Sequence, residues 1–204
     1  MFDYWFNQYT SRGFIPGGMF SCQDVRYIPI PKNSSSYVGK LLLANNWGID
    51  NFLTTDLANK KVIVLLRDPV KRWVSGMAQY LCSTGYPPEL TISEWNRLTT
   101  TLVFDRMIFD DHTEKQVYFI NSVPKESCVY FAGVHGVAEK LQKYLSTQGI
   151  DLNIVDVDAD SSTQHAMLSK FLNGLLEKDT KLVDRIKEVY AEDYALINGI
   201  KFYD

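Results

Sequence analysis

Short apolar runs in this chain alternate with segments of helical periodicity. The clearest run is 61–67 (KVIVLLR), whose five consecutive apolar residues predict a strand buried on both faces. Asp68 and Pro69 follow as an N-cap and a first-turn proline, and apolar residues then recur at helical spacing. Apolar runs at 25–31 and 127–134 are also followed by helical patterns. This alternation predicts an α/β fold in three layers, with a mainly parallel central sheet flanked by helices.

The rest of the chain is less regular. Residues 1–24 are aromatic and then rich in turn-forming residues, so we expect an irregular lead-in there. We expect a loop over 83–100, a helix over about 111–121 and a long helical region over 166–197. No linker or repeat interrupts the pattern, and 204 residues suit one domain, so the expectation is a single domain over 1–204.

Composition narrows the classes of function. Hydrophobic residues make up 46% and charged residues 22%, which is typical of a globular protein. The 21 Lys and Arg against 24 Asp and Glu give a net charge of −3, which disfavours a nucleic-acid binder. A protein that binds a small anion through a few well-placed cationic side chains stays possible.

The cysteines and the apolar segments indicate the compartment. Cys22, Cys82 and Cys128 form neither a disulfide framework nor a metal-binding CxxC pair, so reduced thiols and no metal are expected. The first residues lack the pattern of a signal peptide, and no stretch has the length of a membrane span. We expect a soluble, cytoplasmic protein.

Two segments that follow predicted strands carry chemistry suited to an anion. The first, Pro31–Ser36 (PKNSSS), has a lysine and small hydroxyl residues where a helix begins, with Ser34 or Ser35 as its cap. In the second, Arg67 ends the strand and Ser75 lies about two turns into the next helix, so both could reach one phosphate. Each alone has a plainer interpretation, as a helix cap or as an arginine paired with Asp68.

Together and in this order, PKNSSS and VIVLLRDPVKRWVSG resemble the sulfotransferases that use 3′-phosphoadenosine 5′-phosphosulfate. The C-terminal YAEDYALI is similar to an ending common in the carbohydrate-type branch, and the R-x-G-x-x-G-x-W segment of the cytosolic small-molecule branch is absent. The resemblance implies a P-loop NTPase-like architecture. It also implies in-line transfer of a sulfuryl group from that nucleotide to a hydroxyl of a glycan or related metabolite.

The resemblance also implies roles for individual residues. Lys32 would bridge the 5′-phosphate and the sulfuryl group, where a preplaced ammonium stabilises the charge that grows on the leaving oxygen. Arg67 and Ser75 would bind the 3′-phosphate. The loop and helix start would contact the 5′-phosphosulfate through Asn33, Ser34, Ser35, Ser36 and Tyr37.

A base must take the proton of the acceptor hydroxyl, and His112 is the first candidate. The segment DDHTEKQ resembles a D-x-H-x-x-x-Q pattern of some glycan sulfotransferases, and the spacing predicts His112 and Gln116 on one helical face. Asp110 or Asp111 would orient the imidazole and raise its pKa towards neutrality. A plain helix-start histidine stays the alternative. Other candidates for the base are His135, Asp50 and Asp56, whereas His165 is expected at the surface.

Two further sets of residues complete the prediction. Residues 83–110 and 151–165 are expected to form acceptor or lid segments. Trp73, Tyr86 and Trp95 could stack on a sugar or adenine, but packing in the core is the preferred interpretation. A small basic pocket on an acidic body is expected from Lys32, Arg67, Lys71 and Arg72.

Two alternatives to a sulfotransferase stay open. One is a nucleotide kinase-like phosphotransferase, which the missing GxxxxGK[ST] pattern disfavours. The other is a catalytically inactive sulfotransferase-like module that binds nucleotide or glycan.

Overall fold

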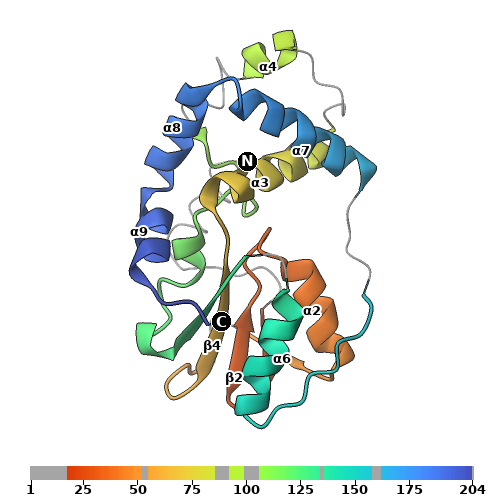
Figure 1. The fold of residues 1–204 in the computed structure, drawn as a ribbon, viewed down its shortest axis with the longest axis vertical. Coiled ribbons are helices and arrows are strands. Elements are labelled where there is room, and N and C mark those ends of the chain that lie inside the picture. The colour runs from red at the N-terminus through yellow and green to blue at the C-terminus, as the bar shows by residue number, and fades with distance from the viewer. Residues whose placement is uncertain are drawn as a thin grey trace. The chain divides into compact units, whose positions relative to one another are not determined.

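The protein is α/β, with a five-stranded mixed sheet flanked by helices (Figure 1). The computed structural model describes residues 18–51, 55–85, 92–98, 106–133, 136–157 and 162–203. The strands are β1 (Met19–Cys22), β2 (Val25–Ile28), β3 (Gly48–Asp50), β4 (Lys61–Leu66) and β5 (Cys128–Ala132). The helices are α2 (Ser35–Ala44), α3 (Pro69–Ser83), α4 (Ile92–Leu98), α6 (Val137–Thr147), α7 (Thr163–Leu176), α8 (Thr180–Val189) and α9 (Ala191–Gly199), with 3₁₀ turns η2 (Gln116–Phe119) and η3 (Lys125–Ser127).

The sheet is mixed where the sequence predicted a mainly parallel one. Its strand order is β3-β1-β2-β4-β5, and β4 is parallel to both β2 and β5. However, β1 is antiparallel to β2 and to β3. The antiparallel part comes from the expected lead-in, because β1 turns back through Gln23 and Asp24, with Gln23 in a left-handed conformation (φ 49°), and continues as β2.

The chain divides into two compact units, which are described separately. The first comprises residues 1–67, 116–160 and 199–204, and the second comprises 68–115 and 161–198. The predicted single domain over 1–204 stays a prediction.

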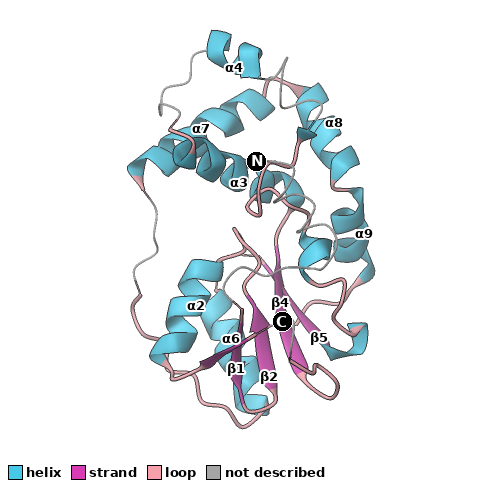
Figure 2. Cartoon of the chain, turned by 180° about the vertical axis from the view of Figure 1, so that it is seen from behind, coloured by secondary structure: helices cyan, strands magenta, loops and turns pink. Residues whose placement is uncertain are grey.

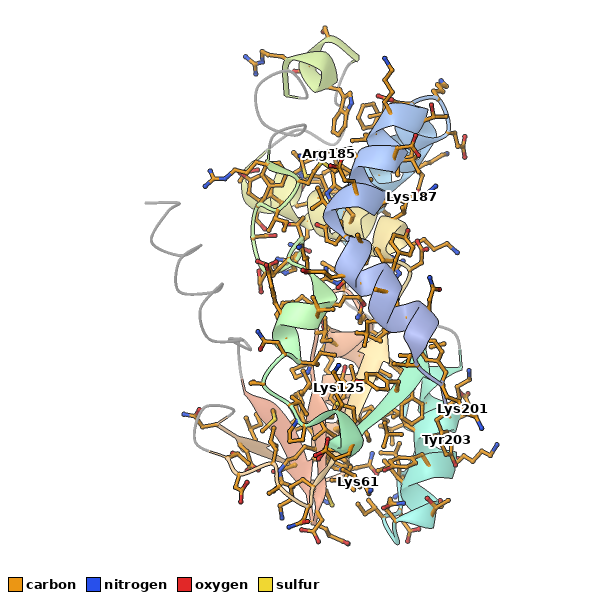
Figure 3. All side chains as sticks on the ribbon, turned by 90° about the vertical axis from the view of Figure 1, so that its left-hand side faces the viewer. Lys61, Lys125, Arg185, Lys187, Lys201 and Tyr203 are labelled. Atoms are coloured by element: carbon orange, nitrogen blue, oxygen red, sulfur yellow. The ribbon has the colours of Figure 1, made fainter. Side chains whose placement is uncertain are left out.

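The first unit contains the sheet. Helices α2 and α6 cover one of its faces, as Figures 1 and 2 show from opposite sides. Buried side chains of these helices, such as Leu41 and Leu141, form one core with Tyr27, Ile63 and Phe131 of the strands. Tyr203, labelled in Figure 3, packs its ring against Phe131, with ring centroids 5.4 Å apart.

The second unit has a core between α3, α7 and α8. Trp73 and Trp95 are buried in this core, and the indole nitrogen of Trp73 donates to the Met107 carbonyl at 3.0 Å. Packing in the core, the preferred interpretation of these two tryptophans, is therefore confirmed. Tyr86 lies outside the described residues.

Several predicted elements are confirmed and others are not. α3 begins as predicted: Pro69 is its first residue and the Asp68 carboxylate accepts from the Lys71 N–H at 2.9 Å. The region 166–197 is helical but divides among α7, α8 and α9, and α4 lies where a loop was expected. Among the described residues, no helix combines the length and apolar character that crossing a membrane requires.

Candidate functional site

The first predicted anion segment and Arg67 meet in the first unit. β2 and β4 are parallel neighbours, so their carboxyl ends lie at the same edge of the sheet. Lys32 follows β2 and Arg67 follows β4. The Arg67 guanidinium donates through Nη1 to the Lys32 carbonyl oxygen at 3.1 Å. The structure therefore places the two cationic residues beside each other, as the sequence predicted.

Residues 32–34, the lysine loop, have an unusual backbone. Lys32 (φ 67°) and Ser34 (φ 62°) are both left-handed, a conformation that is strained for residues other than glycine and recurs at ligand sites. A local hydrogen bond stabilises this conformation: the Asn33 N–H donates to the Ile30 carbonyl at 3.2 Å. Left-handed residues in a tight turn can aim successive N–H groups at an anion.

The start of α2 differs from the predicted serine cap. Ser34 occupies the N-cap position, but its side chain caps no backbone N–H. Its hydroxyl oxygen is buried and makes no hydrogen bond with any residue that the structure describes. Ser35, Ser36 and Tyr37 form the first turn of the helix. Since the hydroxyl does not satisfy these first-turn N–H groups, they can serve an anion at the positive end of the helix.

Asn33 holds the loop in place rather than extending towards solvent. It is 1% exposed, and its Nδ2 donates to the Leu65 carbonyl at 2.7 Å and to Gln116 Oε1 at 2.6 Å. Its Oδ1 is buried and accepts no hydrogen bond within the described part of the chain. Gln116 is the partner that the sequence did not predict, because its spacing from His112 indicated only a shared helical face.

His112 and Ser75 lie in the second unit. His112 Nδ1 is 3.0 Å from Asp110 Oδ2 and 3.0 Å from Asp111 Oδ1. Burial acts to lower the pKa of His112, but these two carboxylates outweigh it and raise the pKa to about 9. The imidazole is therefore protonated at neutral pH, beyond the shift towards neutrality that the sequence suggested.

The same three residues could also ligate a cation. Their candidate ligand atoms lie within 4.8 Å of one another. A metal bound through Nδ1 would have to replace the proton that the carboxylates hold there.

Residues 110–114 do not form the predicted helix. They form turns, followed only by the short η2. The Thr113 hydroxyl accepts from the N–H groups of Phe109 and Asp110 at 2.7 and 3.0 Å, and Asp110 Oδ1 accepts from the His112 N–H at 3.1 Å. Such side chains compete with helical hydrogen bonds. The shared helical face of His112 and Gln116 is therefore a wrong prediction.

Arg72 anchors these turns and does not belong to a basic pocket. Its side chain is buried, and its guanidinium donates to the carbonyl oxygens of Glu114 and of Asp111, the latter at 3.3 Å. The Tyr190 hydroxyl donates to the Thr113 carbonyl. Burial raises the pKa of Glu114 to about 7. The second arginine of the motif thus has a structural task in the loop that carries His112, and its sequence pattern gave no sign of this.

Ser75 and His165 meet on the packed face of α3. His165 Nε2 donates to the Ser75 carbonyl oxygen at 3.0 Å, so His165 is half-buried rather than a surface residue.

The reserve candidates for the base have structural partners or lie outside the described residues. Asp50 forms an ion pair with Arg26 at 2.8 Å, and the Asp56 carboxylate accepts from the Ala58 N–H at 2.9 Å. His135 lies outside the described residues.

The candidate site residues thus fall into two sets. The first unit holds the lysine loop with the start of α2 (residues 32–37), Arg67 and Gln116, and the second holds Ser75 and His112 with its two carboxylates. Comparison with protein-family models, with curated proteins and with solved structures finds no match to this chain.

Proposed function

We propose that the protein is a sulfotransferase that moves a sulfuryl group from 3′-phosphoadenosine 5′-phosphosulfate to a hydroxyl of a glycan or related metabolite. A three-layer, P-loop NTPase-like architecture is part of this proposal. The observation that supports it most is the pairing of the strained lysine loop with Arg67 at the carboxyl ends of β2 and β4. A lysine, a left-handed turn and an uncapped helix start on one sheet edge suit a polyphosphate-like ligand.

The proposed chemistry assigns a task to each charged residue. The acceptor oxygen attacks sulfur, the bond from sulfur to the bridging oxygen breaks, and 3′-phosphoadenosine 5′-phosphate leaves. The Lys32 ammonium would stabilise the charge on that bridging oxygen, and Arg67 would bind the 3′-phosphate. The roles of Ser75 in phosphate binding and of His112 as the base rest on the sequence motif.

His112 would act through Nε2. Its Nδ1–H is directed at the carboxylates of Asp110 and Asp111, which leaves Nε2 to take the acceptor proton. With a pKa of about 9, His112 becomes a base only as the pH rises to that value. We therefore expect kcat/KM to increase with pH up to about 9 and then to level.

Calorimetry with 3′-phosphoadenosine 5′-phosphate tests the donor site. Lys32→Ala and Arg67→Ala should each weaken binding by about 10- to 100-fold, the value of one or two charge-assisted bonds to phosphate. Lys61→Ala removes the same charge at the amino end of β4 (Figure 3) and should leave the affinity unchanged. If the parent protein does not bind the nucleotide, or the Lys32→Ala/Arg67→Ala double variant binds it as tightly, the proposal is wrong.

A separate assay tests the base. The release of 3′-phosphoadenosine 5′-phosphate is measured from the sulfated donor with a panel of oligosaccharide and small hydroxyl acceptors. His112→Ala should keep nucleotide affinity and lose turnover. Unchanged turnover would assign the base to another residue.

The second candidate function is a sulfotransferase-like module that binds nucleotide without turnover. The raised pKa of His112 favours it, because a protonated imidazole cannot accept a proton at neutral pH. Tight nucleotide binding without product from any acceptor at pH 7 or pH 9 would support this candidate over the enzyme.

A further inference from the structure

Gln116 forms hydrogen bonds to both the lysine loop and Arg67, the two parts of the proposed donor site in the first unit. Its side chain is fully buried at the start of η2. Its Oε1 accepts from the Arg67 N–H at 3.0 Å, and its Nε2 donates to the Arg67 carbonyl at 2.9 Å. The same Oε1 accepts from Asn33 Nδ2 at 2.6 Å. One amide therefore pairs with the end of β4 much as a neighbouring strand would, and also binds the lysine loop.

The groups around these two amides fix their orientation. The Arg67 N–H can only donate and the Arg67 carbonyl can only accept, so Gln116 cannot be turned over. Asn33 Nδ2 faces two acceptors, Gln116 Oε1 and the Leu65 carbonyl. If the side-chain amide of Asn33 were rotated by 180°, its oxygen would face these two acceptors and both hydrogen bonds would be lost. The polarity at the end of β4 thus determines how Asn33 is oriented within the loop.

A second link between the same segments runs through the arginine side chain. Arg67 Nη1 donates to the Lys32 carbonyl, while the Gln116 amide binds both the N–H and the carbonyl of Arg67. Without Gln116, the Arg67 backbone and the Asn33 amide would each lose a partner, and the arginine would donate from a less fixed position.

We infer that Gln116 is a positioning residue of the donor site: its buried amide fixes the lysine loop and Arg67 to each other, so that both cations present their charges to one nucleotide. This inference rests on the proposed function. In this inference Gln116 itself makes no contact with the nucleotide. Its effect is preorganisation, which raises affinity because less order has to be imposed on binding. A misplacement of about 1 Å in a site can lower a reaction rate by about 100-fold.

The test uses Gln116→Met, which keeps the length of the side chain and removes its hydrogen bonds. We expect the affinity for 3′-phosphoadenosine 5′-phosphate, measured by calorimetry, to fall by about 10- to 100-fold. Gln142→Met in α6 is the matched control, because it removes the hydrogen bond from Gln142 Nε2 to the Leu152 carbonyl (2.7 Å) in the same unit. That control should bind the nucleotide as the parent does.

A double-mutant cycle separates positioning from loss of stability. Gln116→Met in an Arg67→Ala background should weaken binding by a smaller factor than it does in the parent, because its effect acts partly through Arg67. Equal factors in both backgrounds would contradict the inference. If Gln116→Met does not fold, Gln116→Glu replaces it in both measurements: it keeps the acceptor oxygen for Arg67 and Asn33 and loses the Nε2 donor to the Arg67 carbonyl, so a smaller loss of affinity, which again decreases in the Arg67→Ala background, is expected.

The outcomes distinguish the two proposals. If the parent does not bind the nucleotide, the proposed function fails and the inference fails with it. If the parent binds and Gln116→Met binds within about twofold, only the inference is wrong.

Discussion

Gly76 in α3 faces the backbone of the turn that carries His112. A Cβ built on Gly76 would lie 2.7 Å from the carbonyl carbon of His112, closer still to its oxygen, and 3.2 Å from Thr113 Cγ2. Ordinary contacts of this kind begin at about 3.4 Å, so Gly76→Ala must displace one backbone by at least about 0.7 Å. The atoms in the way are backbone and cannot rotate aside.

The size of the effect follows from two opposing terms. Overpacking of this kind costs about 1–3 kcal/mol, and the upper end applies because Arg72 and Tyr190 hold the turn against α3. Alanine is a better helix former than glycine by about 1 kcal/mol, which offsets part of the cost. The net loss is about 2 kcal/mol, or a decrease in Tm of about 4–8 °C for a chain of this length.

Gly174→Ala in α7 provides the control. Apart from its chain neighbours and the backbone of its own helix, no atom of the described residues lies within 4 Å of a Cβ built on Gly174, so only the propensity term applies. Thermal unfolding followed by circular dichroism should show that the Tm of Gly174→Ala is raised by about 1–4 °C and that the Tm of Gly76→Ala is lowered. If Gly76→Ala is as stable as the parent, the turn does not lie against α3 and the account of how His112 is held is wrong.

Three further predictions concern the same unit. In an NMR titration, His112 should titrate near pH 9, and Asp110→Asn should lower that pKa towards its ordinary value of about 6.5; a value near 6.5 in the parent would show that the carboxylates do not hold Nδ1. Because the folded-state pKa of His112 is raised, its stabilising contribution is complete below pH about 6.5 and is lost as the pH rises through about 9, so His112→Gln should flatten the pH dependence of the urea midpoint in that window. Arg72→Met should lower the free energy of unfolding by about 1–3 kcal/mol, because the carbonyl oxygens of Glu114 and Asp111 lose the buried guanidinium that donates to them; an unchanged free energy of unfolding in urea would contradict this.

The parts of the fold that were predicted have strong local signals. The run of apolar residues in β4 and the Asp68–Pro69 start of α3 each specify their element within a few residues. β1 and β3 were missed because they are only four and three residues long, and neither shows a periodic pattern. Their pairing depends on partners elsewhere in the chain rather than on their own sequence.

The candidate site shows a similar division. Lys32 and Arg67 could be placed together from sequence, because each follows a strand of a pattern that predicts parallel neighbours. The turn at His112 could not be predicted from sequence. In a helix, the carbonyls of Asp111 and Glu114 would accept from N–H groups of the same helix, whereas here they accept from Arg72, about 40 positions earlier in the chain. The role of Gln116 likewise depends on partners at Asn33 and Arg67 that no local pattern indicates.

The hydrogen bonds between Gln116 and Arg67 have a topological consequence. The chain leaves the first unit after Arg67 and re-enters it at Gln116, so these bonds tie the two ends of the segment 68–115 together. A loop whose ends are fixed tolerates changes of length, since doubling it adds only about 0.6 kcal/mol to the entropy of closure. Insertions and deletions within 68–115 that leave α3 and the turns at 110–114 intact therefore need not move the end of β4.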